Sequence, residues 1–160
     1  MLEMLWGELT AGLPDATQLA RVIVRLIAAI LLGAVVGYQR EQAGKAAGLR
    51  THILVALGTA LFVVSAIGSG MSSEGISRVI QGLASGIGFI GAGAILKLST
   101  TREIQGLTTA ASIWMTAAIG AAVGLGNLGV AVLGTILTWI VLAAIGKIEG
   151  RIEKKPDSEE

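Results

Sequence analysis

The chain has 160 residues, of which 53% are hydrophobic and 14% are charged, and its formal net charge is +1. It contains no cysteine, which excludes disulfides, thiolate metal sites and a cysteine nucleophile. Uncharged apolar stretches of about 18 residues or more recur, which a soluble domain of this size does not need. The composition therefore predicts an integral membrane protein.

The first 18 residues form a lead-in that carries acidic residues and neither lysine nor arginine. A secretory signal opens with positive charge, so this segment is not expected to be one. We predict that residues 1–18 lie outside the cytoplasm. Trp6 and the neighbouring leucines form either a short interfacial turn or a flexible lead-in.

Five apolar segments follow, at about residues 19–38, 53–71, 79–96, 107–125 and 128–146. Each is about long enough to cross a hydrocarbon core of roughly 30 Å. The first is the weakest, because Arg21 and Arg25 lie in its opening turns. The predicted fold is an all-α, polytopic transmembrane bundle over residues 19–146, followed by a polar cytoplasmic tail at 147–160.

The distribution of positive charge predicts the orientation of the bundle. The first and third connections and the tail together hold nine of the 12 lysines and arginines. The second connection holds only Arg78, and the lead-in and the fourth connection hold none. By the positive-inside rule, the N-terminus lies outside and the C-terminus in the cytoplasm. This orientation requires an odd number of spans, which agrees with five.

The segment at residues 82–96 is uncharged and rich in glycine. Its spacing also matches the dinucleotide-binding pattern G-x-G-x-x-G, but that pattern needs a preceding strand and an acidic residue about 20 positions later, and neither is present. In a bilayer, glycines let neighbouring helix backbones approach closely. We therefore predict a central helix surrounded by the others, packed through Gly82, Gly86, Gly88, Gly91 and Gly93.

The first connection is the densest polar feature of the chain. Together with the third connection, it is predicted to form an anion-binding or partner-docking surface. The alternative is an ordinary topology signal in contact with anionic lipid headgroups. His52 is expected at a helix cap or interface, because no second histidine or cysteine could join it around a metal ion. The predicted surface comprises Arg40, Glu41, Lys45, Arg50, Thr51, His52, Arg102 and Glu103.

A stripe of hydroxyl side chains recurs near the start of the fourth segment, at Thr108, Thr109, Ser112 and Thr116. Such a stripe lines a polar pathway or, as we favour, bonds to its own helix and to neighbouring helices. No acidic residue lies inside any of the five segments, and no catalytic arrangement is recognisable. We expect neither an enzyme nor a cofactor-binding protein.

Four motifs in order resemble the MgtC/SapB family of bacterial inner-membrane proteins. The resemblance covers about residues 30–130. It implies a membrane domain of about five helices, and roles in low-magnesium adaptation, stress and virulence. For one branch it also implies inhibitory contact with the F-type ATP synthase. The motifs are Gly37-Tyr-Gln-Arg-Glu41, Ala47-Gly-Leu-Arg-Thr-His52, Ser85-Gly-Ile-Gly-Phe-Ile-Gly-Ala-Gly93 and Gly106-Leu-Thr-Thr-Ala-Ala-Ser-Ile-Trp114.

The chain departs from the family pattern at two places. The family usually has an acidic residue where this chain has Gln39, and Asp-Pro-x-Arg where it has Gly75-Ile-Ser-Arg78. We also expect the chain to lack the cytoplasmic C-terminal domain of the virulence-factor branch, which favours the shorter branch.

The leading prediction is a multi-pass protein of the bacterial inner membrane that is regulatory or binds a partner. It is expected to self-associate, to contact the lipid bilayer, and to bind no nucleic acid. The ATP synthase is a partner implied only by the resemblance. The alternative is a small ion channel or transporter.

Overall fold

The fold is all-α, as predicted, in a computed structural model that describes residues 1–10, 15–97 and 104–145. Two strands of two residues each are the exception. In chain order the elements are α1 (Leu2–Thr10), α2 (Ala16–Gln42), α3 (Leu49–Gly68), α4 (Ser73–Gly93), β1 (Leu96–Lys97), β2 (Ile104–Gln105), α5 (Leu107–Leu125), α6 (Leu128–Ile140) and the π-helical turn η1 (Val141–Ile145).

Side-chain caps set the start of two of the long helices. The Asp15 carboxylate accepts a hydrogen bond from the Gln18 amide at 2.7 Å, and the Ser72 hydroxyl accepts one from the Gly75 amide at 3.2 Å. Both bonds satisfy amides that have no partner within the first helical turn. These caps explain why α2 and α4 begin earlier than the apolar segments predicted.

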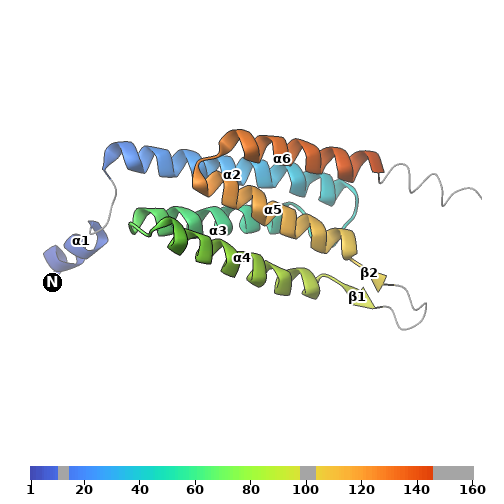
Figure 1. The fold of residues 1–160 in the computed structure, drawn as a ribbon, viewed down its shortest axis with the longest axis horizontal. Helices are drawn as coiled ribbons and strands as arrows, with labels where there is room; N and C mark the ends of the chain where they lie inside the picture. The colour runs from blue at the N-terminus through green and yellow to red at the C-terminus, as the bar shows by residue number, and fades with distance from the viewer. Residues whose placement is uncertain (11–14, 98–103, 146–160) are drawn as a thin grey trace, which may run out of the picture.

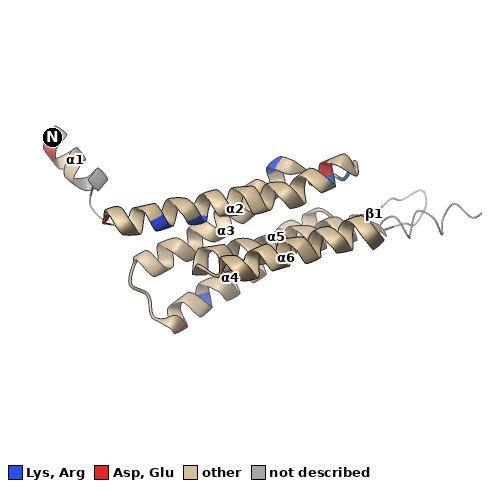
Figure 2. Cartoon of the chain, turned by 90° about the horizontal axis from the view of Figure 1, so that it is seen from above, with Lys and Arg blue, Asp and Glu red and all other residues tan. Residues whose placement is uncertain are grey.

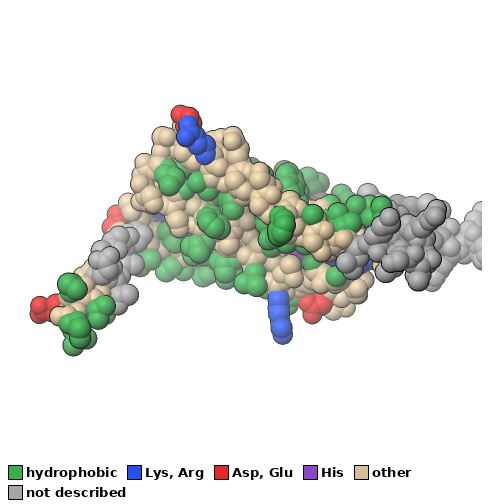
Figure 3. Space-filling view, turned by 90° about the horizontal axis from the view of Figure 1, so that it is seen from below, with side chains coloured by type: hydrophobic (Ala, Val, Ile, Leu, Met, Phe, Trp, Pro, Cys, Tyr) green, Lys and Arg blue, Asp and Glu red, His purple; other side chains and the backbone are tan. Residues whose placement is uncertain are grey.

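The helices α2 to α6 run side by side in an elongated bundle, and α1 lies apart from it (Figure 1). Three helices, α2, α3 and α5, are long and apolar enough to cross a membrane, and Leu128–Ala144 is a shorter apolar helix. Most charged residues lie toward the helix ends, while Arg21 and Arg25 lie further inside α2 (Figures 2 and 3). This pattern fits a protein whose middle lies in a bilayer.

The centre of the bundle is α3, which packs most extensively against α2 and α5. Both neighbours approach it through glycines. A Cβ atom on Gly33 of α2 would lie 2.8 Å from the His52 carbonyl oxygen, and one on Gly124 of α5 would lie 2.7 Å from Val63 Cβ. These contacts are too close for any side chain, so glycine sets the distance between the helix axes.

The prediction that the glycine-rich helix is surrounded does not hold within the chain, because α4 lies at the edge of the bundle. Only Ile87 and Gly91 of its 21 residues are buried. A Cβ atom on Gly91 would contact Ala110 at 3.5 Å. The other glycines predicted to pack have open space where a Cβ would be: Gly82, Gly86, Gly88 and Gly93.

A short hairpin joins α4 to α5. Its antiparallel strands pair Leu96 with Gln105 and Lys97 with Ile104. Gly106 then enters α5 with a φ of +95°, and a Cβ atom there would collide with the Ala94 carbonyl oxygen. Glycine is therefore required at this position both for its backbone conformation and for space.

Candidate functional site

The connection between α2 and α3 is held by a cap from one helix to the next. The Glu41 carboxylate, in the last turn of α2, accepts a hydrogen bond from the Leu49 amide at 2.8 Å. Gly48 precedes α3 and has no side chain of its own to act as a cap. A Cβ atom on Gly48 would lie 2.8 Å from the same Glu41 oxygen, so the glycine leaves room for the capping carboxylate.

Arg40 is buried beside this cap, with 3% of its surface exposed. Its Nη2 donates a hydrogen bond to the Thr109 hydroxyl of α5 at 3.1 Å. Its Nε is buried without a hydrogen-bond partner among the described residues, as is Oε1 of the adjacent Gln39. Within the described part of the chain, Arg40 also forms no salt bridge, since the one ion pair found there joins Arg78 to Glu74 on α4.

His52, one turn into α3, is completely buried. Its Nδ1 lies 2.9 Å from the Gly48 carbonyl oxygen, and its Nε2 lies 3.2 Å from the Ser112 hydroxyl of α5. Its backbone faces α2, where Gly37 leaves space: a Cβ atom on that glycine would lie 3.0 Å from His52 Cβ. His52 therefore lies at the junction of three helices, as an interface residue.

The hydroxyl stripe of α5 is largely turned inward. Ser112 donates to the Thr109 carbonyl at 2.8 Å, and Thr116 donates to the Ser112 carbonyl at 2.8 Å. All three side chains are buried, whereas Thr108 is exposed. The buried hydroxyls bond to their own helix and to α2 and α3, which is the favoured of the two roles predicted for them.

These contacts form a polar network that joins α2, α3 and α5 at the end of the bundle where α2 meets α3. The network is defined by Arg40, His52, Thr109 and Ser112. Within the described residues, no three His, Cys, Asp or Glu side chains gather in a way that could hold a metal ion.

The structure therefore shows that some residues of the predicted docking surface are buried and others are exposed. Arg40 and His52 are buried, so these two residues do not lie on the exposed part of the predicted surface. Glu41, Lys45 and Arg50 are exposed and Thr51 is half-buried. Arg102 and Glu103 lie outside the described residues.

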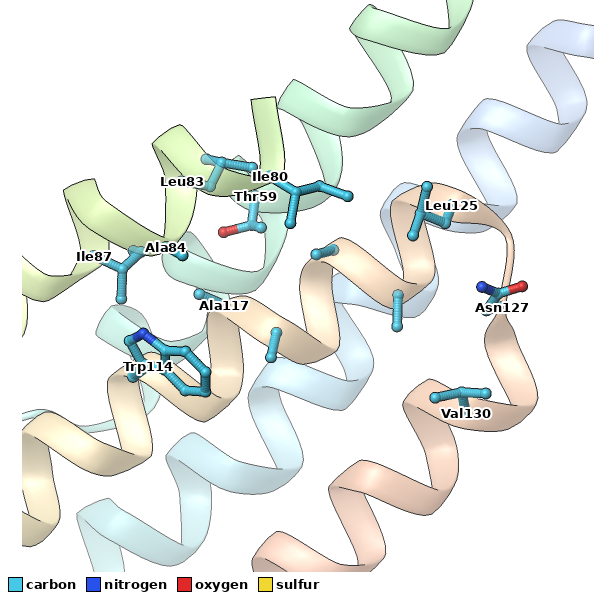
Figure 4. Close-up of a pocket in the computed structure, with 13 residues that line it drawn as sticks. Thr59, Ile80, Leu83, Ala84, Ile87, Trp114, Ala117, Leu125, Asn127 and Val130 are labelled. Atoms are coloured by element: carbon cyan, nitrogen blue, oxygen red, sulfur yellow. The ribbon is translucent and has the colours of Figure 1, made fainter. Parts of the chain in front are cut away.

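A second feature was not predicted from the sequence. An apolar groove of about 450 Å³ lies between α4, α5 and α6 (Figure 4). Ile87 and Trp114 line it toward one end, Leu125 and Asn127 toward the other, and alanines of α5 such as Ala117 form its floor. The alanines at positions 117, 118, 121 and 122 recur on one side of a helix, and this spacing was the available signal.

The α4 side of this groove is also open. Phe89 is 84% exposed, and Gly88 and Ala92 line a smaller apolar recess of about 290 Å³ beside Trp114. The outer face of α4 therefore combines open glycines with an exposed aromatic ring, which is a shape that another helix can pack against.

The comparisons with known proteins agree on one family. The MgtC family model matches residues 26–151. SrpB of Synechococcus elongatus is 44% identical over 136 residues, covering 78% of this chain and 75% of SrpB. YhiD of Escherichia coli, named as a candidate magnesium transporter, is 41% identical over 143 residues, covering 85% of this chain and 66% of YhiD.

MgtC of Salmonella typhimurium is 39% identical over 138 residues, covering 86% of this chain and 58% of MgtC. The chain thus spans less than two thirds of YhiD and of MgtC. No solved structure matches the chain.

Proposed function

We propose, since the chain belongs to the MgtC family, that it is a regulatory membrane protein that acts by binding a partner and takes part in magnesium homeostasis. The observation that carries this proposal is the open face of α4. Gly82, Gly86 and Phe89 are all exposed there, beside an apolar groove.

The spacing of glycines supports self-association through this face. The chain has three pairs of glycines four residues apart in its long helices that match G-x-x-x-G: Gly33 with Gly37, Gly120 with Gly124, and Gly82 with Gly86. The first two pairs form the close contacts to α3. A Cβ atom on either glycine of the third pair would meet no described residue within 4 Å, so we assign this pair to contact with a second copy or another membrane helix.

The polar network supports a regulatory role over transport. A pathway for Mg²⁺ needs oxygen ligands, with carboxylates prominent among them, or water along its length. The buried hydroxyls of α5 are instead bonded to carbonyls or to Arg40. We propose no catalytic activity for this protein.

We place the protein in the bacterial inner membrane with five spans. In this topology α4 and α6 cross the bilayer together with the three more apolar helices, the N-terminus is outside, and the C-terminus is cytoplasmic. Reporter fusions at Gly44, at Thr100 and after the last residue are expected to report cytoplasm, and fusions at Ser72 and Asn127 the outside. A cytoplasmic signal at Asn127 would exclude five spans.

The partner is tested by affinity capture from native membranes in mild detergent, with the self-associated form measured by crosslinking. Gly86→Leu is expected to reduce the crosslinked dimer or the captured partner. The matched control is Gly129→Leu on α6, another glycine with open space around it. Capture of the ATP synthase would identify the partner that the resemblance implies.

The competing transport function is tested in parallel. The purified protein in liposomes is expected to give no magnesium flux above that of empty liposomes. Specific flux would favour the channel or transporter and would remove the regulatory proposal, whatever the capture experiment showed.

A further inference from the structure

His52 is the single histidine of the chain, and both of its ring nitrogens contact oxygen atoms in the buried network. The two contact partners differ in whether they can donate a hydrogen bond. A backbone carbonyl accepts hydrogen bonds and cannot donate them, whereas a serine hydroxyl can do both with a single proton. The arrangement therefore constrains where the ring protons lie.

The Gly48 contact requires a proton on Nδ1. At 2.9 Å, the Gly48 carbonyl oxygen must receive a hydrogen from the ring, because two lone pairs at this distance would repel. The same carbonyl accepts the His52 backbone amide at 3.2 Å, which confirms that it is turned toward this residue.

The Ser112 contact requires a second ring proton whenever Ser112 keeps its own bond. The hydroxyl of Ser112 lies 2.8 Å from the Thr109 carbonyl oxygen, which can only accept. With its one proton used there, the hydroxyl can only accept from Nε2. All the contacts are satisfied together when both ring nitrogens carry a proton, which is the charged imidazolium form of His52.

A neutral ring forces a different arrangement. With the proton on Nδ1, Nε2 becomes an acceptor, so the Ser112 hydroxyl must turn to donate to it. The Thr109 carbonyl then loses the Ser112 bond. Because the Thr109 side chain also accepts from Arg40, the change reaches α2 as well as the seam between α3 and α5.

The charges around the ring are few. On α2, Arg40 faces it and repels a charged ring, while the Glu41 carboxylate is occupied by the α3 cap. On α3 itself Arg50 is exposed, and in the connection Lys45 is exposed. The described part of α5 contributes hydroxyls and no titratable group. On α4, Glu74 and Arg78 bond to each other in the first turns, far along the helix from the network.

We propose that His52 is a reversible proton-binding site, and that its protonation sets the direction of the Ser112 hydroxyl bond and thereby couples α2, α3 and α5 to pH. The two acceptors, Gly48 and Ser112, favour the charged ring. The Arg40 guanidinium opposes it. Burial of the ring opposes it more strongly, because a buried site disfavours the charged form.

The test is a nitrogen-15 NMR titration of ring-labelled histidine in the full chain, in detergent or lipid nanodiscs. A single histidine gives a single set of ring signals, whose shifts distinguish protonated from bare nitrogen. Between about pH 5 and pH 9, we expect both nitrogens protonated at the acid end and Nδ1 alone at the alkaline end. A neutral ring with its proton on Nε2, or a ring that takes up no second proton across this range, would overturn the proposal.

Two variants distinguish a specific effect on the protonation of His52 from a general effect on helix packing. Ser112→Ala is expected to lower the proton affinity of His52 by about three- to tenfold, because it removes the acceptor of a charge-assisted bond. Thr135→Ala is the control, since Thr135 is a buried hydroxyl on α6 that donates to the Ala131 carbonyl and does not contact His52. An unchanged midpoint in Ser112→Ala would contradict the proposed hydrogen-bond switch.

If Ser112→Ala fails to fold, Arg40→Gln provides an independent measurement. It removes the facing positive charge and is expected to raise the proton affinity of His52 by about threefold or more. Arg50→Gln, at an exposed position on the same helix as His52, is expected to change it less. Equal shifts in the two arginine variants would overturn the assignment of Arg40 as the opposing charge.

Discussion

The glycines of α5 and those of α4 have the same spacing and opposite surroundings. Gly120 and Gly124 are buried against α3, whereas Gly82 and Gly86 are exposed. The number of glycines in a helix therefore does not identify the centre of this bundle. What distinguishes the two helices is the neighbour: α3 presents Ala56 and other small residues to α5, whereas none of the described helices covers the outer face of α4.

The largest effect in this comparison is expected at Gly120. A Cβ atom there would collide with the Ala56 carbonyl oxygen, so Gly120→Leu must push α5 away from α3. Overpacking costs typically about 1–3 kcal/mol and occasionally more, which exceeds the roughly 1 kcal/mol that leucine gains in helix propensity. Thermal unfolding in detergent should show a large fall in Tm. A Tm equal to that of the parent would remove the argument for a close α3–α5 seam.

A smaller loss is expected one turn further along the same helix, at its C-terminal end. Arg25 of α2 donates a hydrogen bond to the Gly124 carbonyl at 2.9 Å, where α5 ends. A cation at a helix C-terminus contributes about 0.3–1 kcal/mol, and up to about 2 kcal/mol when partly buried. Arg25→Ala should therefore lower Tm more than Arg21→Ala, because Arg21 is exposed. Equal losses in the two variants would show that the cap contributes nothing.

The α3 cap should have an effect of about the same size or less. Glu41→Ala removes the acceptor for the Leu49 amide and is expected to cost about 1 kcal/mol. The matched control is Glu74→Ala, which breaks an exposed pair with Arg78 on α4 and should cost less, about 0.5 kcal/mol. Amide hydrogen exchange at the start of α3 should increase only in Glu41→Ala, and exchange that stays unchanged would contradict the capping role.

The smallest effect on the folded chain is expected at Gly86. The added methyl group of Gly86→Ala meets no described neighbour, so Tm should stay unchanged or rise. The gain in helix propensity would contribute up to about 1 kcal/mol to the free energy of unfolding. The same variant should weaken self-association if α4 is the interface. A fall in Tm measured on the monomer would mean that the face of α4 that carries Gly86 is also packed within the chain.

Much of the fold was predictable because backbone groups in a bilayer must be paired within helices. The segment predicted at residues 107–125 coincides with α5, and the predicted all-α class is confirmed. The ends of other helices were less accurate. Polar residues such as Arg40 and Glu41 extend α2 to Gln42, and an apolar segment does not reveal them as helical.

The candidate site was harder to predict, because its contacts join residues far apart in sequence. Arg40 is 69 positions from Thr109, and His52 is 60 positions from Ser112. A charge at the end of a span has the same sequence pattern whether it faces lipid headgroups or a buried hydroxyl. For the same reason, the sequence did not show which G-x-x-x-G pairs are buried, since this depends on which helix lies opposite each pair.

The contact between Arg25 and Gly124 also bears on how the chain enters the membrane. The two residues are 99 positions apart, and the N-terminal part of a chain is synthesised first. During synthesis, therefore, the Gly124 carbonyl is absent until α5 has been made. Only then does the charge gain a carbonyl partner. The contact between α2 and the end of α5 can therefore be completed only after the later helices have been made.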